Sequence, residues 1–122
     1  MMGNERIEGS IRRLESARYF EEPDRVPVLI DVGAPFYASV LGYTLKDYYR
    51  NVDICRHVQV EGSKWAFGTL GDDRTGTIGE DDAVPDIGAV AEGIVFGCSI
   101  SLPDDDNPWL SPWIVPSLKS LD

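Results

Sequence analysis

Residues 25–31 read Arg-Val-Pro-Val-Leu-Ile-Asp, and this short apolar run decides the fold that the sequence predicts. The run is rich in β-branched residues and is bounded by turn-forming residues, a pattern typical of a strand buried on both faces of a parallel sheet. Pro27 suits the first residues of such a strand, where a missing N–H is tolerated. We therefore expect a buried strand here.

An amphipathic helix is predicted before this strand. Asn4 can cap the helix, and its apolar residues recur at three- and four-residue spacing on one stripe that contains Ile7, Ile11, Leu14 and Ala17. Pro23 disfavours helical backbone in the residue before it, so the helix is expected to end near Phe20.

Two further helices are predicted after the strand. Residues 32–35, Val-Gly-Ala-Pro, break the strand and open a loop at its C-terminal end, where α/β barrel proteins place active-site residues. Thr44 then caps a short helix, and Asn51 caps a second one that runs from Val52 to about Trp65.

The last part of the chain is expected to contain more loop. Residues 71–82 are rich in glycine and acidic residues, which predicts an exposed loop. Residues 89–96 predict a brief helix that ends at Gly97, and residues 98–102 alternate like a half-buried strand. Residues 117–122 have the pattern of a helix start, so we expect that the protein continues further.

Composition and charge are those of a globular protein that avoids polyanions. The chain is 43% hydrophobic and 26% charged, with 21 acidic and 11 basic residues and a net charge of −10. This charge argues against nucleic acid and anionic membrane surfaces as partners. No run of about 18 apolar residues and no apolar signal region is present. We expect a cytoplasmic protein in which Cys55 and Cys98 are reduced thiols.

Four stretches of the chain together resemble one protein family. They are Glu-Pro-Asp-Arg-Val-Pro-Val at 22–28 after the opening helix, Leu-Gly-Asp-Asp-Arg-Thr at 70–75, Val-Pro-Asp-Ile-Gly-Ala-Val-Ala-Glu-Gly at 84–93, and Phe-Gly-Cys at 96–98 running to Leu-Pro-Asp-Asp-Asp-Asn-Pro-Trp at 102–109. Their order is similar to that of the uroporphyrinogen decarboxylase family, which also includes methylcobamide:coenzyme M methyltransferases and related corrinoid-linked methyltransferases. The stretch at 22–28 is the most specific of the four.

The resemblance implies an α/β fold in which the chain forms the N-terminal portion of a (β/α)8 barrel, with N-terminal helices and an inserted hairpin. A complete barrel takes roughly 250 residues. Residues 1–122 are therefore expected to form a single partial domain with the first strand and part of the second. Such an open barrel leaves strand edges and apolar faces uncovered.

The resemblance also implies a catalytic residue. In decarboxylases of the family, an aspartate near the second strand faces the pyrrole N–H groups of the substrate. Asp86 occupies the matching segment and is the candidate for this role, since a carboxylate there could accept N–H donors and stabilise a cationic ring intermediate. The alternative is a loop carboxylate that caps Ala89 and its neighbours.

Substrate-binding candidates come from the first predicted loop and from one arginine. Family decarboxylases bind substrate carboxylates through arginines in this loop, but the chain has none there and instead presents Asp31, Phe36 and Tyr37. Arg74, in the acidic loop, is the remaining cationic candidate. For Asp31 the alternative is a turn carboxylate at a strand end.

No metal site is expected within the chain. Family methyltransferases bind zinc through ligands in their C-terminal half, so zinc or a corrinoid is expected only in a full-length relative. Cys55 and His57 point to nearly opposite sides of a helix and cannot share one ion. The acidic groups at 72–73, 80–82 and 104–106 lack the spacing of a calcium loop and are expected to be solvated. Trp109 and Trp113 could form a substrate lid or an apolar cover.

The missing arginines favour a relative of the corrinoid-linked methyltransferases over a true uroporphyrinogen decarboxylase, because a polyanionic tetrapyrrole needs cationic anchors. The expected partner is a tetrapyrrole, a corrinoid or another small-molecule substrate of the full-length protein. The alternative is a non-catalytic chain that folds only as a homo-oligomer or with a partner chain that supplies the missing strands.

Overall fold

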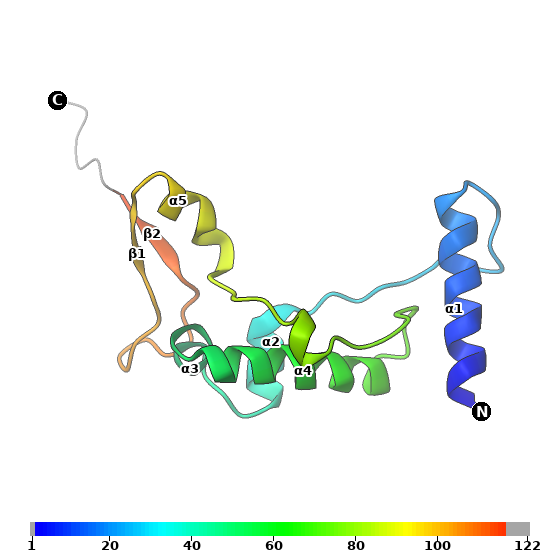
Figure 1. The fold of residues 1–122 in the computed structure, drawn as a ribbon, viewed down its shortest axis with the longest axis horizontal. Coiled ribbons are helices and arrows are strands. Elements are labelled where there is room, and N and C mark those ends of the chain that lie inside the picture. The colour runs from blue at the N-terminus through cyan, green and yellow to red at the C-terminus, as the bar shows by residue number, and fades with distance from the viewer. Residues whose placement is uncertain (1, 117–122) are drawn as a thin grey trace.

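A computed structural model describes residues 2–116 as a mostly helical small domain with one antiparallel hairpin (Figure 1). The elements in chain order are α1 (Met2–Arg18), α2 (Gly33–Val40), α3 (Leu45–Arg50), α4 (Val52–Thr69), the 3-10 turns η1 (Glu80–Asp82) and η2 (Gly88–Val90), α5 (Ala91–Val95), β1 (Ser99–Ser101) and β2 (Trp113–Val115). In Figure 1, α1 lies at one end, α2 to α4 form the centre, and α5 with the hairpin lies at the other end.

The central helices hold the main core. Leu45 and Tyr48 of α3 pack with Cys55 and Val58 of α4 and with Ala38 of α2, all of them buried.

The predicted caps that start two of these helices are confirmed. The Thr44 side chain accepts from the Asp47 backbone N–H in a reciprocal capping box, and the Asn51 side chain accepts from the first turn of α4.

The helix α2 corrects one prediction. A loop was expected after residue 35, but residues 33–40 are helical, because Pro35 lies in the first turn, where its missing N–H is tolerated. Gly62 of α4 lets α2 approach closely, since a Cβ atom there would lie 2.6 Å from Cγ of Tyr37. Phe36 and Tyr37 are therefore helical residues.

The predicted first helix is confirmed as α1, and side chains attach it to the rest of the molecule. Arg6 donates to the backbone oxygens of Phe67 and Asp72, both at 3.1 Å, and its guanidinium lies 5.0 Å from the Phe67 ring centroid. Phe20 follows the helix with a φ of 60°, the left-handed backbone that ends it. The helix is thus held mainly by polar contacts.

The predicted strand over 25–31 is wrong for the part of the chain that the structure describes. The segment is extended but pairs with no strand among residues 2–116. Its backbone instead bonds to the loop at 72–74: Val28 N–H donates to the Asp73 carboxylate at 2.8 Å, and Ile30 N–H donates to the Asp72 carboxylate at 2.9 Å. Carboxylate side chains have taken the positions that a neighbouring strand would fill.

The expected hairpin is present. The strand predicted at 98–102 is confirmed as β1, which pairs antiparallel with β2 through Ile100 opposite Ile114. The brief helix predicted at 89–96 corresponds to η2 and α5, and Gly97 ends it with a φ of 76°.

The hairpin of β1 and β2 is the only sheet within residues 2–116, so the described residues form no barrel. The helix start predicted at 117–122 lies outside them.

The helices of the described part include none that is both long enough and apolar enough to span a bilayer.

Candidate functional site

A hollow of about 340 Å³ opens between α2, α4 and the segment before η2. Two residues proposed from the sequence, Tyr37 and Asp86, both line it. Most of the remaining lining is apolar or uncharged, and consists of Ala34, Tyr48, Val58, Gln59, Ser63, Ile78, Val84 and Pro85. A mostly apolar hollow with a few converging polar groups is the usual form of a small-molecule site.

The half-buried carboxylate of Asp86 is held by two donors. The Tyr48 hydroxyl donates to its Oδ2 at 2.6 Å, and the Gly88 backbone N–H donates to its Oδ1 at 2.7 Å. The second contact is the loop-capping role that the sequence left open for this residue. The first one ties the carboxylate to a side chain from the centre of the core.

Tyr48 and Gln59 extend this contact into a polar chain. Burial, and then the hydrogen bond to Asp86, raises the pKa of Tyr48 far above its usual value, so the phenol remains a donor. The Gln59 side-chain amide donates to the Tyr48 hydroxyl at 3.4 Å. It also forms two hydrogen bonds with the Val84 backbone, donating to the carbonyl oxygen at 2.7 Å and accepting from the N–H at 3.1 Å. The segment that carries Asp86 is thereby fastened to α4.

The sequence did not single out Tyr48 or Gln59 as site residues. Gln59 follows Cys55 by one helical turn, next to the apolar stripe of α4, and Gln59 donates to the Cys55 sulfur at 3.3 Å. A long amide beside a stripe that is otherwise apolar is the signal that could have identified it. Tyr48 carries no such signal, because a buried tyrosine on a short helix is an ordinary core residue.

Arg74 and Asp31 have local structural partners. Arg74 donates twice to Asp72 at 2.7 Å and once to the Ile30 backbone oxygen at 2.7 Å. Asp31 is exposed and accepts from the Gly33 backbone N–H at 3.1 Å, so its carboxylate supports the start of α2. Neither lines the hollow that contains Asp86. Phe36 points to the Trp65 ring, with centroids 5.5 Å apart.

The expectation that residues 72–73 are solvated is wrong. Asp72 is 5% exposed and Asp73 is 1% exposed. Asp73 accepts from Ser10, from Arg13 at 2.6 Å and from Arg25 at 2.7 Å, in addition to the backbone of the extended segment. Hydrogen bonds lower the pKa of both carboxyls well below the usual range, led by Arg74 for Asp72 and by the Val28 N–H for Asp73. The contacts of these two residues join α1 and the extended segment to the loop that follows α4.

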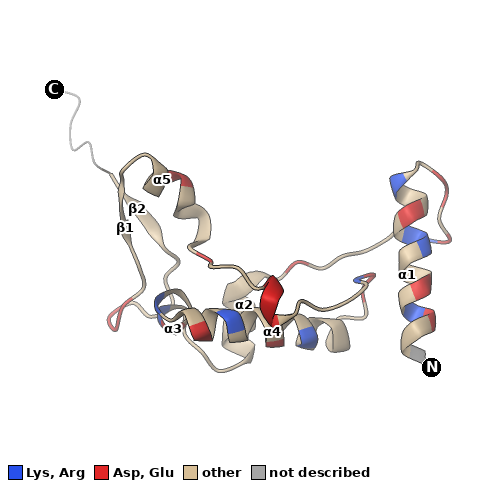
Figure 2. Cartoon of the chain, in the orientation of Figure 1, with Lys and Arg blue, Asp and Glu red and all other residues tan. Residues whose placement is uncertain are grey.

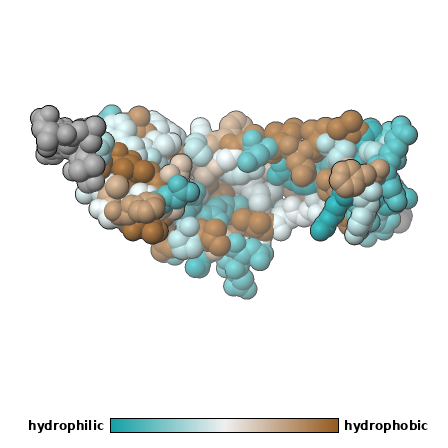
Figure 3. Space-filling model, turned by 90° about the horizontal axis from the view of Figure 1, so that it is seen from above, coloured by the Kyte–Doolittle hydropathy of each residue, from teal (hydrophilic) through white to brown (hydrophobic). Residues whose placement is uncertain are grey.

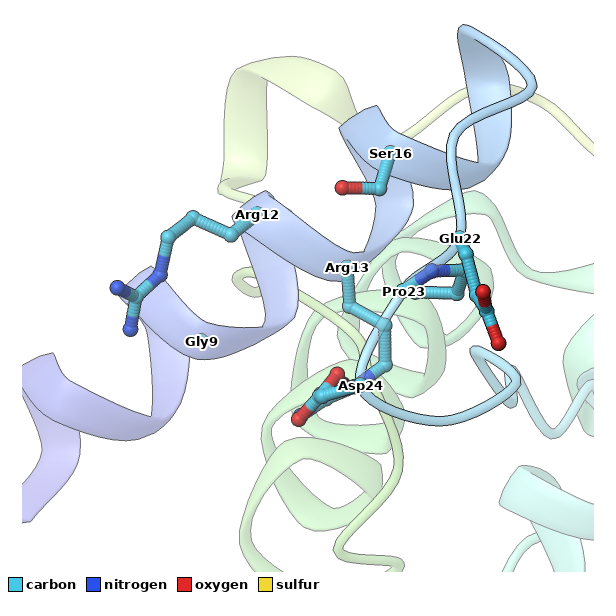
Figure 4. Close-up of a pocket in the computed structure, with 7 residues that line it drawn as sticks. All are labelled: Gly9, Arg12, Arg13, Ser16, Glu22, Pro23 and Asp24. Atoms are coloured by element: carbon cyan, nitrogen blue, oxygen red, sulfur yellow. Dashed lines mark hydrogen bonds and ion pairs between the residues drawn. The ribbon is translucent and has the colours of Figure 1, made fainter.

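A second hollow, of about 350 Å³, lies beside α1 and is polar (Figure 4). In this view Arg13 and Asp24 point toward one another. Arg13 donates from Nε to Oδ1 of Asp24 and from Nη2 to Oδ2, each at 2.7 Å. The Arg13 hydrogen bond lowers the pKa of Asp24. Arg13 is already paired with Asp24 and Asp73, so the other charged side chains that line this hollow are Arg12 and Glu22.

No cluster of three His, Cys, Asp or Glu side chains suited to a metal ion occurs within residues 2–116. Cys55 is buried beside Gln59, and the His57 ring meets the Tyr43 ring edge-on at 5.8 Å. The two side chains thus serve different contacts. Trp113 begins β2 and Trp109 lies in the connection between β1 and β2, and these strands lie at the other end of the molecule from α1 (Figure 1).

Comparison of the chain with models of known protein families, with curated proteins and with solved structures gives no match.

Proposed function

We propose that the chain is the N-terminal segment of a uroporphyrinogen decarboxylase-like barrel protein, of the corrinoid-linked methyltransferase type. Its extended segment at 26–31 would become the first barrel strand when the rest of the barrel is present. The hollow around Asp86 would form part of the wall of the substrate site. The observation that carries this proposal is the state of the two edges of the extended segment.

One edge of the segment is saturated and the other is open. Val28 and Ile30 direct their N–H and C=O groups to residues 72–74. Successive residues of an extended chain point in opposite directions, so Leu29 faces the other way. Its N–H and C=O have no hydrogen-bond partner among residues 2–116. An edge of this kind is ready to pair with a further strand.

The side chains of the same segment lack a cover. Val26, Val28, Leu29 and Ile30 are 77%, 48%, 60% and 40% exposed, although the run is as apolar as a doubly covered strand. Covering them would contribute about 1 kcal/mol or more for each side chain. Additional strands and helices would supply both the hydrogen bonds and this cover.

The lining of the Asp86 hollow supports the choice within the family. It includes a carboxylate and two phenols but no lysine, arginine or histidine. A polyanionic tetrapyrrole would find no cationic anchor there, whereas a substrate with hydrogen-bond donors would find Asp86 as the acceptor. Zinc and a corrinoid would bind to parts of the protein beyond this chain.

A non-catalytic chain that pairs with a second copy or a partner is the alternative, favoured by the same open edge. Leu29→Pro distinguishes this alternative from the proposal, because the N–H that this change removes has no partner among residues 2–116. Self-pairing through the edge predicts an oligomer that Leu29→Pro converts to a monomer. Val28→Pro is the matched control, since it removes the donor to Asp73.

The first test is a thermal melt of the 122-residue chain by circular dichroism, with light scattering for its mass. We expect a melt of low cooperativity, and rapid hydrogen exchange at the Leu29 amide. The reading frame after the Asp122 codon is expected to encode further strands and a His/Cys zinc motif. A cooperative melt at monomer mass with a protected Leu29 amide would overturn the proposal.

A further inference from the structure

The negative charge of the chain is concentrated in its C-terminal third. Residues 75–116 contain eight of the 21 acidic residues and none of the 11 lysines and arginines. In Figure 2, η1, α5 and the hairpin accordingly carry red and no blue. This part of the surface has a field that attracts cationic groups.

Large apolar side chains are exposed over the hairpin end of the same region. Val95 and Phe96 are 83% and 84% exposed, and Trp109 and Trp113 are each 55% exposed. Figure 3 shows brown side chains gathered at this end. Exposed apolar patches with polar rims mark interaction sites in soluble proteins.

The helix α5 packs against one side of the hairpin. Ile114 covers Gly93 of α5, where a Cβ atom would lie 2.6 Å from the Ile114 Cδ1. Side chains alternate along a strand, so Trp113 and Val115 point to the opposite face. They stand there opposite Ser101 and Ser99 of β1. Because a lone two-stranded hairpin is marginally stable, an additional layer on this face would stabilise it.

A small hollow of about 40 Å³ beside this face combines aromatic, aliphatic and acidic groups. Trp113, Leu110 and Asp104 are among its lining residues. The Oδ1 of Asp104 accepts from the backbone N–H groups of Asp106 at 3.1 Å and Asn107 at 2.9 Å. Its Oδ2 has no hydrogen-bond partner in the described part of the chain. A lysine or arginine that lay across the mouth of this hollow would place its methylenes on the apolar side chains and its charged end near Asp104.

We propose that this hairpin face, formed by the outward side of β1 and β2 with Leu110 and Asp104, docks a basic and partly apolar protein segment. A lysine or arginine of that segment lies across the mouth of the hollow beside Asp104 and Trp113. The face lies at the opposite end of the molecule from α1 and does not involve the extended segment at 26–31 (Figure 1).

The charge of the face selects this occupant over two others. A second copy would bring an equally acidic surface, and opposed like charges weaken association. An anionic membrane is repelled for the same reason. Within residues 2–116, the two cations that contact the neighbouring loop have other partners: Lys46 pairs with Asp105, and Arg50 donates to the backbone oxygens of Leu102 and Pro103.

Two synthetic peptides test the proposal against the full 122-residue chain. They share the same apolar residues, and their polar positions carry lysine and arginine in one peptide and glutamate in the other. Fluorescence anisotropy is expected to show binding of the basic peptide at least about tenfold tighter than the acidic one, with an affinity that falls as salt is added.

Two matched variants place the contact on the hairpin. Asp104→Asn keeps the oxygen that accepts from the loop but removes the charge. It is expected to weaken binding of the basic peptide about fivefold. Asp81→Asn removes an exposed acid on η1 and is expected to leave the affinity within about twofold. Circular dichroism confirms that both variants keep the helical content of the parent.

Three results would overturn the proposal. The first is equal affinity for both peptides, and the second is an Asp104→Asn variant that binds as tightly as the parent. The third is occupation of the face by another partner: a concentration-dependent doubling of mass that Val115→Lys abolishes indicates a second copy, and binding to phosphatidylserine vesicles indicates a lipid surface.

Discussion

Replacement of Asp73 by asparagine is expected to release α1 from the rest of the molecule. The Asp73 carboxylate is almost fully buried and receives Arg13, Arg25, Ser10 and the Val28 N–H. Removal of one partner from a buried ion pair costs about 3–5 kcal/mol. We expect the lower value, about 3 kcal/mol, because Arg25 is half exposed and the amide oxygen still accepts one N–H.

Hydrogen exchange of the α1 amides measures this loss directly, because their exchange follows the free energy of local opening. A loss of about 3 kcal/mol corresponds to exchange roughly 100-fold faster. Asp24→Asn is the matched control, since it removes the exposed partner of the same Arg13 and should change the rate less than about fivefold. If both variants exchange at similar rates, the attachment of α1 does not depend on Asp73.

The remaining predictions concern pH and the central helices. The folded-state pKa of Asp73 is depressed, so its stabilisation is present above the usual value near 3.8 and is lost as pH falls through the depressed pKa; the α1 amides should therefore stay protected at pH 5 and lose protection only below about pH 4. Gly62→Ala should destabilise α4 by about 1–3 kcal/mol through its clash with Tyr37, whereas Gly68→Ala, which meets open space in the same helix, should be neutral or stabilising in the same exchange measurement. Tyr48→Phe removes the hydrogen bond to the carboxylate across the hollow and should speed exchange of the segment at 84–88, at a cost of about 1.5 kcal/mol; unchanged exchange there would show that the bond does not hold the segment.

Local sequence signals were sufficient for most of the helices. Apolar spacing placed α1, and the side-chain caps at Thr44 and Asn51 placed the starts of α3 and α4. These signals act within one or two helical turns, so they can be recognised without knowing what the helix packs against. The helix α2 was missed because Pro35 was taken as a breaker, although it lies in a first turn.

The candidate site was only partly accessible to sequence reasoning. Asp86 and Tyr37 were proposed and line one hollow, but Tyr48 and Gln59 became visible only in the structure. Arg74 was proposed as a substrate anchor, and the structure pairs it with Asp72. The identity of a charge partner depends on the folded path of the chain, which composition and spacing do not specify.

The sequence by itself determined α1, α3 and α4, the brief helix before Gly97, the β1 strand and the acidic character of the last third. Only the tertiary structure decided that Asp72 and Asp73 are buried and that they, and not a neighbouring strand, receive the backbone of residues 25–31. The physical reason is that helix caps and periodicity are local, whereas the hydrogen bonds of an extended segment must be made by groups distant in the sequence. Here the partner groups lie more than 40 positions along the chain.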